Sequence, residues 1–444
     1  MKNYTILIAA VAAFGGLLFG FDTAVITGTL QYLRSYFQLS DSELGFVVAS
    51  VAIGAIPGAL FSGRLADFFG RKTMMLVTAL LFLISAAGSG LAGTYTALVI
   101  YRMIGGAAIG MASTLAPIYI SEVAYPEYRG RLGMLQQLAI VLGILVSFIS
   151  NYFIVSASFS FLHEGNYWRY MLGSEMVPAV IFFLLLLMVP ESPRWLILKN
   201  KIARAKNVFG KIYIPEKADE QVQLVLQDLM AAGPPKLRDV FSSRYIKVVI
   251  IGLVFASIAH LTGINVIFYY APLIFEQTRM GGSILFQTML LGIANFLFTL
   301  IAFPLIDKLG RKKLLLIGSW SMAAGMFFIG WLFFTDNLQN YLVLISIFLY
   351  IGAFACTWGA VIWVYVAEIY PNKIRGTATS IAVFGNWTFN SLVAFTFPIM
   401  LSGLGPALTF FVYGLFNLGM VFFVSRYIFE TKGVPLEKVE ELYR

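Results

Sequence analysis

The segment EVAYPEYRG, from Glu122 to Gly130, recurs 246 positions further along the chain as EIYPNKIRG, from Glu368 to Gly376. In both copies a glutamate and an arginine stand seven residues apart. A second pair, DFFGRK at 67–72 and DKLGRK at 307–312, is separated by 240 positions. Two repeats in the same order and at similar separations predict two equivalent halves that run in the same direction.

The composition is that of a membrane protein. Of the 444 residues, 59% are hydrophobic and only 12% are charged, whereas a soluble domain has about 25% charged residues. Because a membrane-spanning helix needs about 20 apolar residues, the apolar stretches predict twelve such helices, six in each half. They cover 4–30, 44–63, 73–93, 96–120, 131–153, 169–189, 246–276, 283–306, 313–334, 340–369, 375–402 and 405–428.

A polar stretch from Glu191 to about Ser243 separates the halves, and its charge pattern predicts short amphipathic helices on the cytoplasmic side. The first apolar segment is too long for the apolar part of a signal peptide, so we interpret it as the first helix. The predicted fold is an all-α membrane protein with a division into four parts. These are a six-helix half over 1–190, linker helices over 191–243, a second six-helix half over 244–428 and a short tail over 429–444.

The distribution of basic residues predicts the orientation. An even number of spans places both termini on one side of the membrane. If that side is the cytoplasm, the outer loops carry only three of the 31 Lys and Arg residues, namely Arg34, Arg169 and Arg279. Because Lys and Arg concentrate in cytoplasmic loops, both termini are expected inside, in a bacterial cytoplasmic (inner) membrane. The net charge of +9 then reflects topology, and nucleic acid is not an expected partner.

The counts of reactive residues exclude several classes of protein. A single cysteine, Cys356, rules out an intramolecular disulfide, and two histidines, His163 and His260, are too few for a His-rich metal site. The sequence has no nucleotide-binding loop, metal-ligand cluster or nucleophile–base arrangement. It therefore predicts neither an enzyme nor a bound cofactor.

Asp22 and Arg102 fall inside the predicted first and fourth helices. At about 1.5 Å per residue, Asp22 lies roughly 24 Å from one membrane face and Arg102 roughly 9 Å from the other. Both therefore lie at a similar depth in a core of about 30 Å, where an unpaired carboxylate is costly and marks a functional candidate. An arginine keeps the carboxylate ionised, and a proton breaks the pair. The alternatives are a proton-coupling site and a static pair that holds two helices together.

Six motifs follow one another in a fixed order. They are GGLLFGFDTAVITG (15–28), GRLADFFGRK (63–72), PIYISE (117–122), PESPRW (190–195), GINVIFYYAP (263–272) and ETKG (430–433). Together they resemble the sugar porter family of the major facilitator superfamily over nearly the whole chain, and its bacterial proton-coupled members in particular. The resemblance implies a substrate site between the two six-helix halves, alternating access, and proton coupling by Asp22 and Arg102.

The resemblance also implies a sugar site made of amides, which hydrogen-bond hydroxyl groups, and aromatic rings, which stack on C–H faces. The implied contacts are Gln137, Asn265, Tyr269, Asn295, Trp363, Asn386 and Trp387, with Phe19 as a further aromatic candidate. For each amide, the alternative role is a hydrogen bond between helices.

Two adjacent positions depart from the family pattern, because Ala259 and His260 replace a pair of glutamines that grip the sugar. One hydrogen-bonding arm is lost and the other becomes an imidazole. We expect His260 to act as a hydrogen-bonding substitute in the substrate site, and the alternative is a histidine that titrates near neutral pH.

Acidic and basic residues cluster at the predicted cytoplasmic ends of the helices. They are Asp67 with Arg71, Glu122 with Arg129, Glu191 with Arg194, Asp307 with Arg311, and Glu368 with Arg375. Their repetition in both halves predicts charge networks that lock the halves on the inner side and part when that side opens. The alternative is surface charge that marks topology, since isolated exposed pairs contribute little.

These features predict a proton-coupled symporter for a pentose or hexose, such as D-xylose or D-glucose, with the proton as coupling ion. The expected partners are the sugar and the lipid bilayer, and the protein is expected to function as a monomer. One alternative is a passive sugar or polyol facilitator, against which Asp22 argues. Another is a transporter-like sugar sensor, against which the short tail argues.

Overall fold

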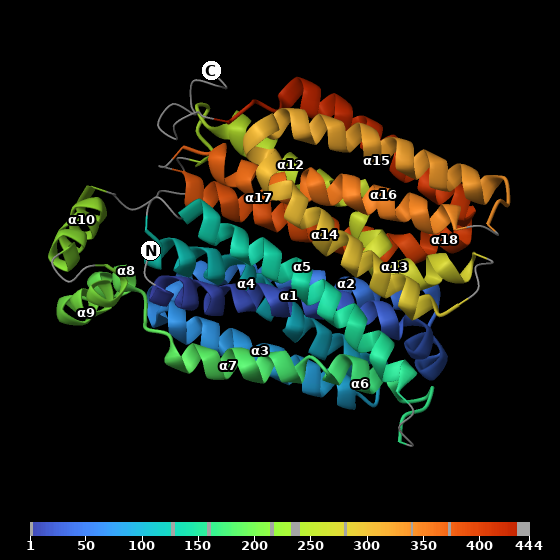
Figure 1. Cartoon of the computed structure of the whole chain (residues 1–444), viewed down its shortest axis with the longest axis horizontal. Helices are drawn as coiled ribbons and strands as arrows, with labels where there is room; N and C mark the ends of the chain where they lie inside the picture. The colour runs from blue at the N-terminus through green and yellow to red at the C-terminus, as the bar shows by residue number, and fades with distance from the viewer. Residues whose placement is uncertain are drawn as a thin grey trace.

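The structure of the chain, a computed structural model, is built almost entirely of helices (Figure 1). It describes residues 3–125, 129–157, 161–213, 217–231, 240–278, 282–338, 341–371 and 374–432. Within these ranges, eleven helical segments are long and apolar enough to cross a membrane. The last, α18 (Arg375–Tyr427), is broken at Gly405, whose φ of 77° is left-handed, and it makes two crossings. The predicted all-α architecture with twelve crossings is confirmed.

The first half is a bundle of six crossings, coloured blue to green in Figure 1. Its helices are α1 (Asn3–Phe37), α2 (Asp41–Phe69), α3 (Arg71–Leu91), α4 (Tyr95–Val123), α5 (Arg129–Ser156), α6 (Tyr167–Gly173) and α7 (Met176–Met188), of which the last two form one crossing. Helix α1 continues seven residues beyond its predicted end at Leu30, because a helix does not need apolar side chains once it leaves the bilayer.

The second half is a matching bundle, coloured yellow-green to red in Figure 1. Its elements are α12 (Ile246–Ile258), η3 (Ala259–Thr262), α13 (Ile264–Glu276), α14 (Ile284–Leu309), α15 (Arg311–Phe334), α16 (Leu342–Cys356), α17 (Trp358–Glu368) and α18. Two crossings are interrupted, one by η3 and one at Thr357, whose φ of −129° and ψ of −89° are not helical. Irregular backbone at membrane depth is tolerated where it lines a cavity or is buried in protein.

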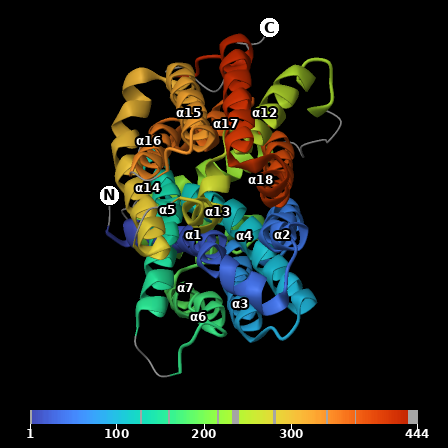
Figure 2. The same cartoon turned by 90° about the vertical axis from the view of Figure 1, so that its right-hand side faces the viewer.

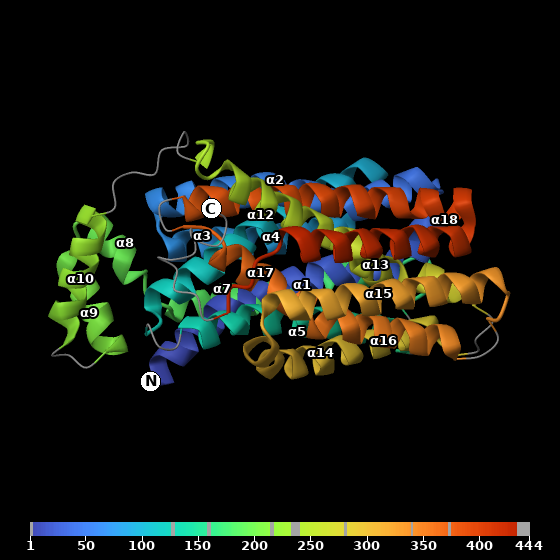
Figure 3. The same cartoon turned by 90° about the horizontal axis from the view of Figure 1, so that it is seen from above.

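In the described part of the linker, three short helices lie at one end of the bundle, which we call the linker end; the opposite end is the far end (Figures 1 and 3). They are α8 (Pro193–Leu198), α9 (Ile202–Ile212) and α10 (Ala218–Ala231). Helix α9 buries Ala205, Val208 and Phe209 along one face, as its amphipathic pattern predicts. The hydroxyl of Tyr125 donates to the carbonyl of Ile212 at 2.6 Å, which attaches the linker helices to the first half.

Glycines let α2 and α4 approach each other closely within the first half. A Cβ atom at Gly54 would lie 2.1 Å from the carbonyl oxygen of Met103. One at Gly106 would lie 2.0 Å from the carbonyl oxygen of Val51. Such contacts leave no room for a side chain and are typical of tightly packed membrane helices, so these two helices form a rigid pair.

The two halves touch each other at the far end, which faces the viewer in Figure 2. On one side, a Cβ atom at Gly45 of α2 would lie 2.4 Å from the carbonyl oxygen of Phe395 of α18. On the other side, a Cβ atom at Gly292 of α14 would lie 2.9 Å from the ring of Phe148 of α5. The far end is therefore closed in this structure.

Candidate transport site

A cavity lies between the two halves. Its volume is about 150 Å³, which is room for several water molecules. All nine residues predicted to bind substrate line it: Phe19, Gln137, His260, Asn265, Tyr269, Asn295, Trp363, Asn386 and Trp387. The fold thus brings together side chains from seven elements of both halves. Their contact with a sugar stays a prediction.

The break before α13 positions two of these side chains. Gly263 precedes α13 with a φ of 92°, a left-handed conformation that favours glycine. The carbonyl of Thr262, at the end of η3, accepts hydrogen bonds from the hydroxyl of Tyr350 at 2.7 Å and from Nδ2 of Asn417 at 3.0 Å. Asn265 and Tyr269 then follow one turn apart on the same face of α13.

Hydrogen bonds join the polar residues of the cavity in a chain. Nδ2 of Asn265 donates to Nδ1 of His260 at 2.7 Å and to Oδ1 of Asn390 at 3.1 Å. The hydroxyl of Tyr269 donates to the same oxygen of Asn390 at 3.4 Å. Because Nδ1 of His260 accepts, the neutral ring carries its proton on Nε2 and offers an N–H donor. Asn390, which the resemblance did not assign to the site, is central to this chain and also lines the cavity.

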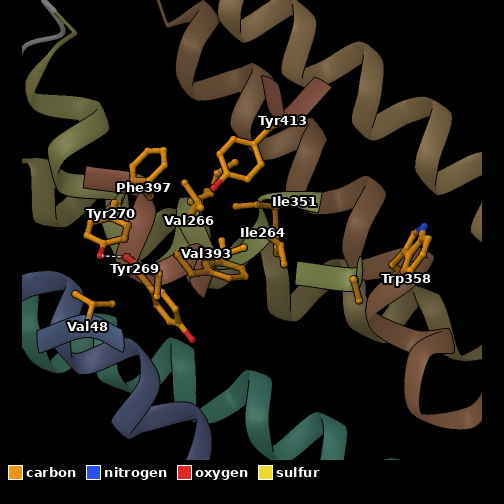
Figure 4. Packing of buried hydrophobic residues seen from close by; sticks show 14 of the residues in the cluster. Val48, Ile264, Val266, Tyr269, Tyr270, Ile351, Trp358, Val393, Phe397 and Tyr413 are labelled. Carbon is orange, nitrogen blue, oxygen red and sulfur yellow. Dashed lines mark hydrogen bonds between the residues drawn. The ribbon is translucent and has the colours of Figure 1, made fainter. Parts of the chain in front are cut away.

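Two adjacent tyrosines on α13 have different roles, and Figure 4 shows them pointing to different sides of the helix. The hydroxyl of Tyr270 donates to the carbonyl of Ala394 at 2.6 Å, and its ring centroid lies 5.1 Å from that of Phe397. Tyr270 therefore anchors α13 in the core of the second half, whereas Tyr269 lines the cavity.

Aromatic rings from opposite halves meet at the cavity. The ring centroids of Phe19 on α1 and Trp387 on α18 lie 5.5 Å apart. Trp363 on α17 adds a third ring to the cavity wall. Such rings provide flat apolar faces on which the C–H surface of a sugar can stack.

Asp22 and Arg102 are paired inside the first half. Nη1 of Arg102 donates to Oδ1 of Asp22, and Nη2 donates to the backbone carbonyl of Asp22 at 3.1 Å. The side chains of Asp22 and Arg102 are 0% and 2% exposed. Since Phe19 and Thr23 of the same helix line the cavity, the ion pair and the cavity share α1.

A third ionisable residue, Glu175, belongs to this buried cluster and was not among the predicted site residues. It lies between α6 and α7, is 1% exposed, and interacts electrostatically with Asp22 and Arg102. Two carboxyl groups and one guanidinium lie in this cluster, so it is neutral when it holds one proton. A signal was present in the sequence, because Glu175 falls inside the predicted span 169–189, where any carboxylate is a functional candidate.

Arg71 is the centre of an ion-pair network at the linker end of the first half. Its Nε and Nη2 atoms each donate to Glu122 at 3.1 Å, and Oδ1 of Asp67 lies 2.9 Å from Nη2. At the start of α3, Glu191 accepts the backbone N–H groups of Arg71 at 2.9 Å and of Lys72 at 3.1 Å. Burial raises the pKa of Glu191, whereas these N–H groups act in the opposite direction.

The second half repeats this arrangement around Arg311, whose Nη2 and Nε donate to Glu368 at 2.7 and 3.0 Å. At the start of α15, Glu430 accepts the backbone N–H groups of Arg311 at 2.9 Å and of Lys312 at 3.1 Å. The hydroxyl of Thr431 donates to Glu368 at 2.6 Å. Glu430 is therefore the counterpart of Glu191, a third repeat that is hard to recognise in sequence because only Glu and a following Ser or Thr are shared.

The described ion pairs of Arg71 and Arg311 each hold helices of one half together. Arg375 donates from Nε to the carbonyl of Tyr370 at 3.2 Å, within the second half, and Arg194 lies on α8. The side chains of Arg129 and Asp307 lie outside the described part of the chain. A lock between the halves stays a prediction.

We expect Glu430→Ala to destabilise the protein. The substitution removes the carboxylate that accepts two N–H groups at the start of α15, and loss of such a cap costs about 1 kcal/mol. Thermal unfolding in detergent should therefore shift to lower temperature. Glu220→Ala, at an exposed position of α10, is the control, and equal unfolding temperatures for the two variants would contradict a capping role for Glu430.

A cavity lined by amides and aromatic rings between two repeated membrane bundles, next to a buried ion pair, defines a membrane transporter. The model of the family described as "Sugar (and other) transporter" matches residues 8–443. The chain therefore belongs to the sugar transporter family, whose members are carriers and not enzymes.

Individual relatives match over nearly their full length. The chain is 38% identical to the D-xylose-proton symporter of Escherichia coli (strain K12), over 100% of this chain and 96% of that protein. It is also 38% identical to the arabinose-proton symporter of Bacillus subtilis (strain 168), over 99% and 95%. Among solved structures, the inward-open conformation of the xylose transporter XylE from E. coli has a TM-score of 0.87 at 38% identity, over 98% of this chain and 99% of that one. XylE bound to 6-bromo-6-deoxy-D-glucose has a TM-score of 0.83 at 37% identity, over 99% of each chain.

Proposed function

We propose that the chain is a proton-coupled sugar symporter that works by alternating access. The observation that carries this proposal is the double role of α1, which holds Asp22 of the buried cluster and contributes Phe19 and Thr23 to the cavity. A movement of α1 on protonation therefore reaches the substrate site directly. The names of the relatives, which are proton symporters for xylose and arabinose, support the same function.

The cavity suits an uncharged substrate with many hydroxyl groups. Among the described residues that line it there are amides, hydroxyls, an imidazole and aromatic rings, but no Asp, Glu, Lys or Arg. Amides can pair with neighbouring hydroxyl groups of a sugar, and rings can stack on its C–H surface. A pentose or a hexose is the proposed substrate, with D-xylose and D-glucose the first to test.

The buried cluster of Asp22, Arg102 and Glu175 is the proposed proton site. An uncompensated charge is costly in a buried environment, and the three groups are neutral together when they hold one proton. Asp22 is the proposed carrier because it contacts Arg102 directly. A proton on Asp22 breaks that ion pair and releases α1. The proton is therefore the proposed coupling ion, and the proposed mechanism uses no cofactor.

The linker end is proposed to face the cytoplasm of a bacterial inner membrane, because most Lys and Arg residues lie there. Both termini are then cytoplasmic, and the closed far end faces outside. The TM-score of 0.87 with the inward-open structure of the xylose transporter supports an inward-facing state. In the opposite state, the networks around Arg71 and Arg311 are proposed to meet between the halves 1–190 and 244–428 and to lock the inner side. One chain holds a whole cavity, which makes the monomer the proposed functional unit in the bilayer.

Uptake of labelled sugars into proteoliposomes tests the proposed function. With an inward proton gradient, one sugar should accumulate above its outside concentration, and without the gradient it should only equilibrate. Equilibration in both conditions would identify a passive facilitator. The absence of uptake for xylose, glucose and polyols would exclude the proposed substrate class.

His260→Ala is expected to raise the KM for the sugar about fivefold with little change in the maximal rate. The substitution removes one N–H donor from the cavity and one hydrogen bond of Asn265, and a buried hydrogen bond of this kind contributes about 1 kcal/mol. Initial uptake rates over a range of sugar concentrations measure both constants. His163→Ala, in an exposed loop at the far end, is the control, and equal KM values for the two variants would exclude His260 from the substrate site.

A further inference from the structure

A hydrogen bond crosses between the two halves at the far end. The hydroxyl of Thr27 on α1 donates to the backbone carbonyl of Phe268 on α13 at 2.7 Å. The Thr27 side chain is fully buried and Phe268 is 6% exposed. The bond therefore joins residues that are 241 positions apart in sequence and that belong to different moving bodies under alternating access.

The carbonyl of Phe268 is available because of the proline four residues later. In an α-helix this carbonyl would accept from the N–H of residue 272, but Pro272 has no N–H group. The backbone is also locally irregular, since Tyr270 has a φ of −117° and a ψ of 16°. A buried carbonyl needs a donor, and Thr27 supplies one from the other half.

Neighbouring hydroxyls on α1 behave differently. Thr23 donates to the carbonyls of Phe19 and Gly20, and Thr29 donates to the carbonyl of Ile26, in each case within α1. These bonds move with the helix and do not depend on the other half. Thr27 differs because its acceptor, the carbonyl of Phe268, lies on α13.

The position of Thr27 links the two functional sites. It follows Asp22 by five residues on the continuous helix α1, a rise of about 7.5 Å. Its acceptor, Phe268, lines the cavity and stands between Asn265 and Tyr269 on α13. The bond thus connects the helix of the buried carboxylate to the helix that carries two cavity side chains.

Helix α13 starts at a backbone hinge, and the residue before the hinge is held in place by hydrogen bonds. Gly263 is left-handed, and the preceding carbonyl of Thr262 is held by Tyr350 and Asn417, both of the second half. The part of the crossing beyond the hinge can therefore tilt while η3 stays in place. A contact that holds α13 against α1 therefore contributes to closing the far end.

We propose that Thr27 is a positioning residue that closes the far end by holding α13 against α1 through the proline-released carbonyl of Phe268. The bond forms when the cavity faces the linker end and is lost when the far end opens. Movement of α1, which carries Asp22, is thereby transmitted to the helix of Asn265 and Tyr269. This inference rests on the proposed alternating-access function.

The test compares Thr27→Val, which removes the hydroxyl but keeps the shape, with Thr27→Ser, which keeps the hydroxyl. Thr29→Val is the matched control, because it removes a hydroxyl bonded within α1. Spin labels at Ser42→Cys on α2 and Ser402→Cys on α18, both exposed residues toward the far end, report the separation of the halves in liposomes. A Cys356→Ser background removes the native thiol.

Thr27→Val should raise the ratio of far-end-open to far-end-closed molecules roughly 3- to 10-fold, the effect of one buried hydrogen bond on a two-state equilibrium. Thr27→Ser and Thr29→Val should keep the distance distribution of the parent. The inference is overturned if Thr27→Val and Thr29→Val give the same distribution, or if Thr27→Ser shifts it as strongly as Thr27→Val.

Sugar accumulation in the same liposomes separates this inference from the proposed function. A shift in distance for Thr27→Val, together with a lower accumulation ratio, supports both. A parent protein that never accumulates sugar but still shows the shift contradicts symport and leaves the role of Thr27 in closure supported.

Discussion

Replacing Asp22 by asparagine is expected to abolish accumulation of sugar against its gradient while sugar binding and exchange persist. Asparagine keeps the size of the side chain but cannot take up a proton at its amide or pair as an anion with Arg102. A proton that enters with a membrane potential of 100 mV supplies about 2.3 kcal/mol, enough for a roughly 50-fold concentration ratio. In the variant this ratio should fall to about 1.

Uptake with a proton gradient and counterflow without one measure the two properties separately. Glu175→Gln is the informative comparison, because it removes the other carboxyl of the same buried cluster and leaves the ion pair between Asp22 and Arg102 in place. Normal accumulation by Asp22→Asn would contradict the proposed proton carrier. Loss of both accumulation and counterflow would instead assign Asp22 a structural role in holding α1 to α4.

Replacing Gly45 by tryptophan is expected to trap the transporter with its far end open and to reduce uptake to background. A Cβ atom at Gly45 would already lie 2.4 Å from the carbonyl oxygen of Phe395, so an indole ring cannot fit when the halves meet there. The obstacle is backbone and not a flexible side chain, and overpacking of that kind is not relieved by a rotamer change. Sugar binding in detergent, measured by calorimetry, should persist although transport is lost.

Gly63→Trp is the matched control, since Gly63 lies on the same helix and, apart from its chain neighbours and the adjacent helical backbone, no atom lies within 4 Å of a Cβ built there. It should transport at nearly the parental rate. If Gly45→Trp also transports normally, the contact between α2 and α18 is not a gate. If it loses both binding and thermal stability, the substitution has disrupted folding and the far-end contact is structural.

The crossings and the meeting of Asp22 with Arg102 could be predicted from sequence because one physical variable governs both. Bilayer thickness sets the length of an apolar helix and also converts a position along it into a depth. Depth alone placed the two charges at the same level. The resemblance to the family then supplied the cavity residues, which depth alone could not have selected from the other intramembrane amides.

Features that depend on contact between distant segments could not be predicted in this way. Glu430 accepts a backbone N–H at the start of α15, and Asn390 accepts hydrogen bonds from Asn265 and Tyr269. Neither role can be recognised from the residues next to it in sequence. The helix breaks at Thr357, between Cys356 and Trp358. None of these three residues is a proline or a glycine, so the sequence does not signal the break. Glu175 was not among the predicted site residues, although a carboxylate inside the predicted span 169–189 is a functional candidate in its own right.

The buried charges and the polar wall of the cavity are distributed unequally between the halves. Asp22, Arg102 and Glu175 belong to the first half, whereas His260, Asn265 and most other polar cavity residues belong to the second. Under the proposed function, the proton site therefore lies in one repeat and most of the sugar-binding groups lie in the other. Substitutions in the second repeat should therefore change which sugar is bound. The proposed proton site in the first repeat would stay the same.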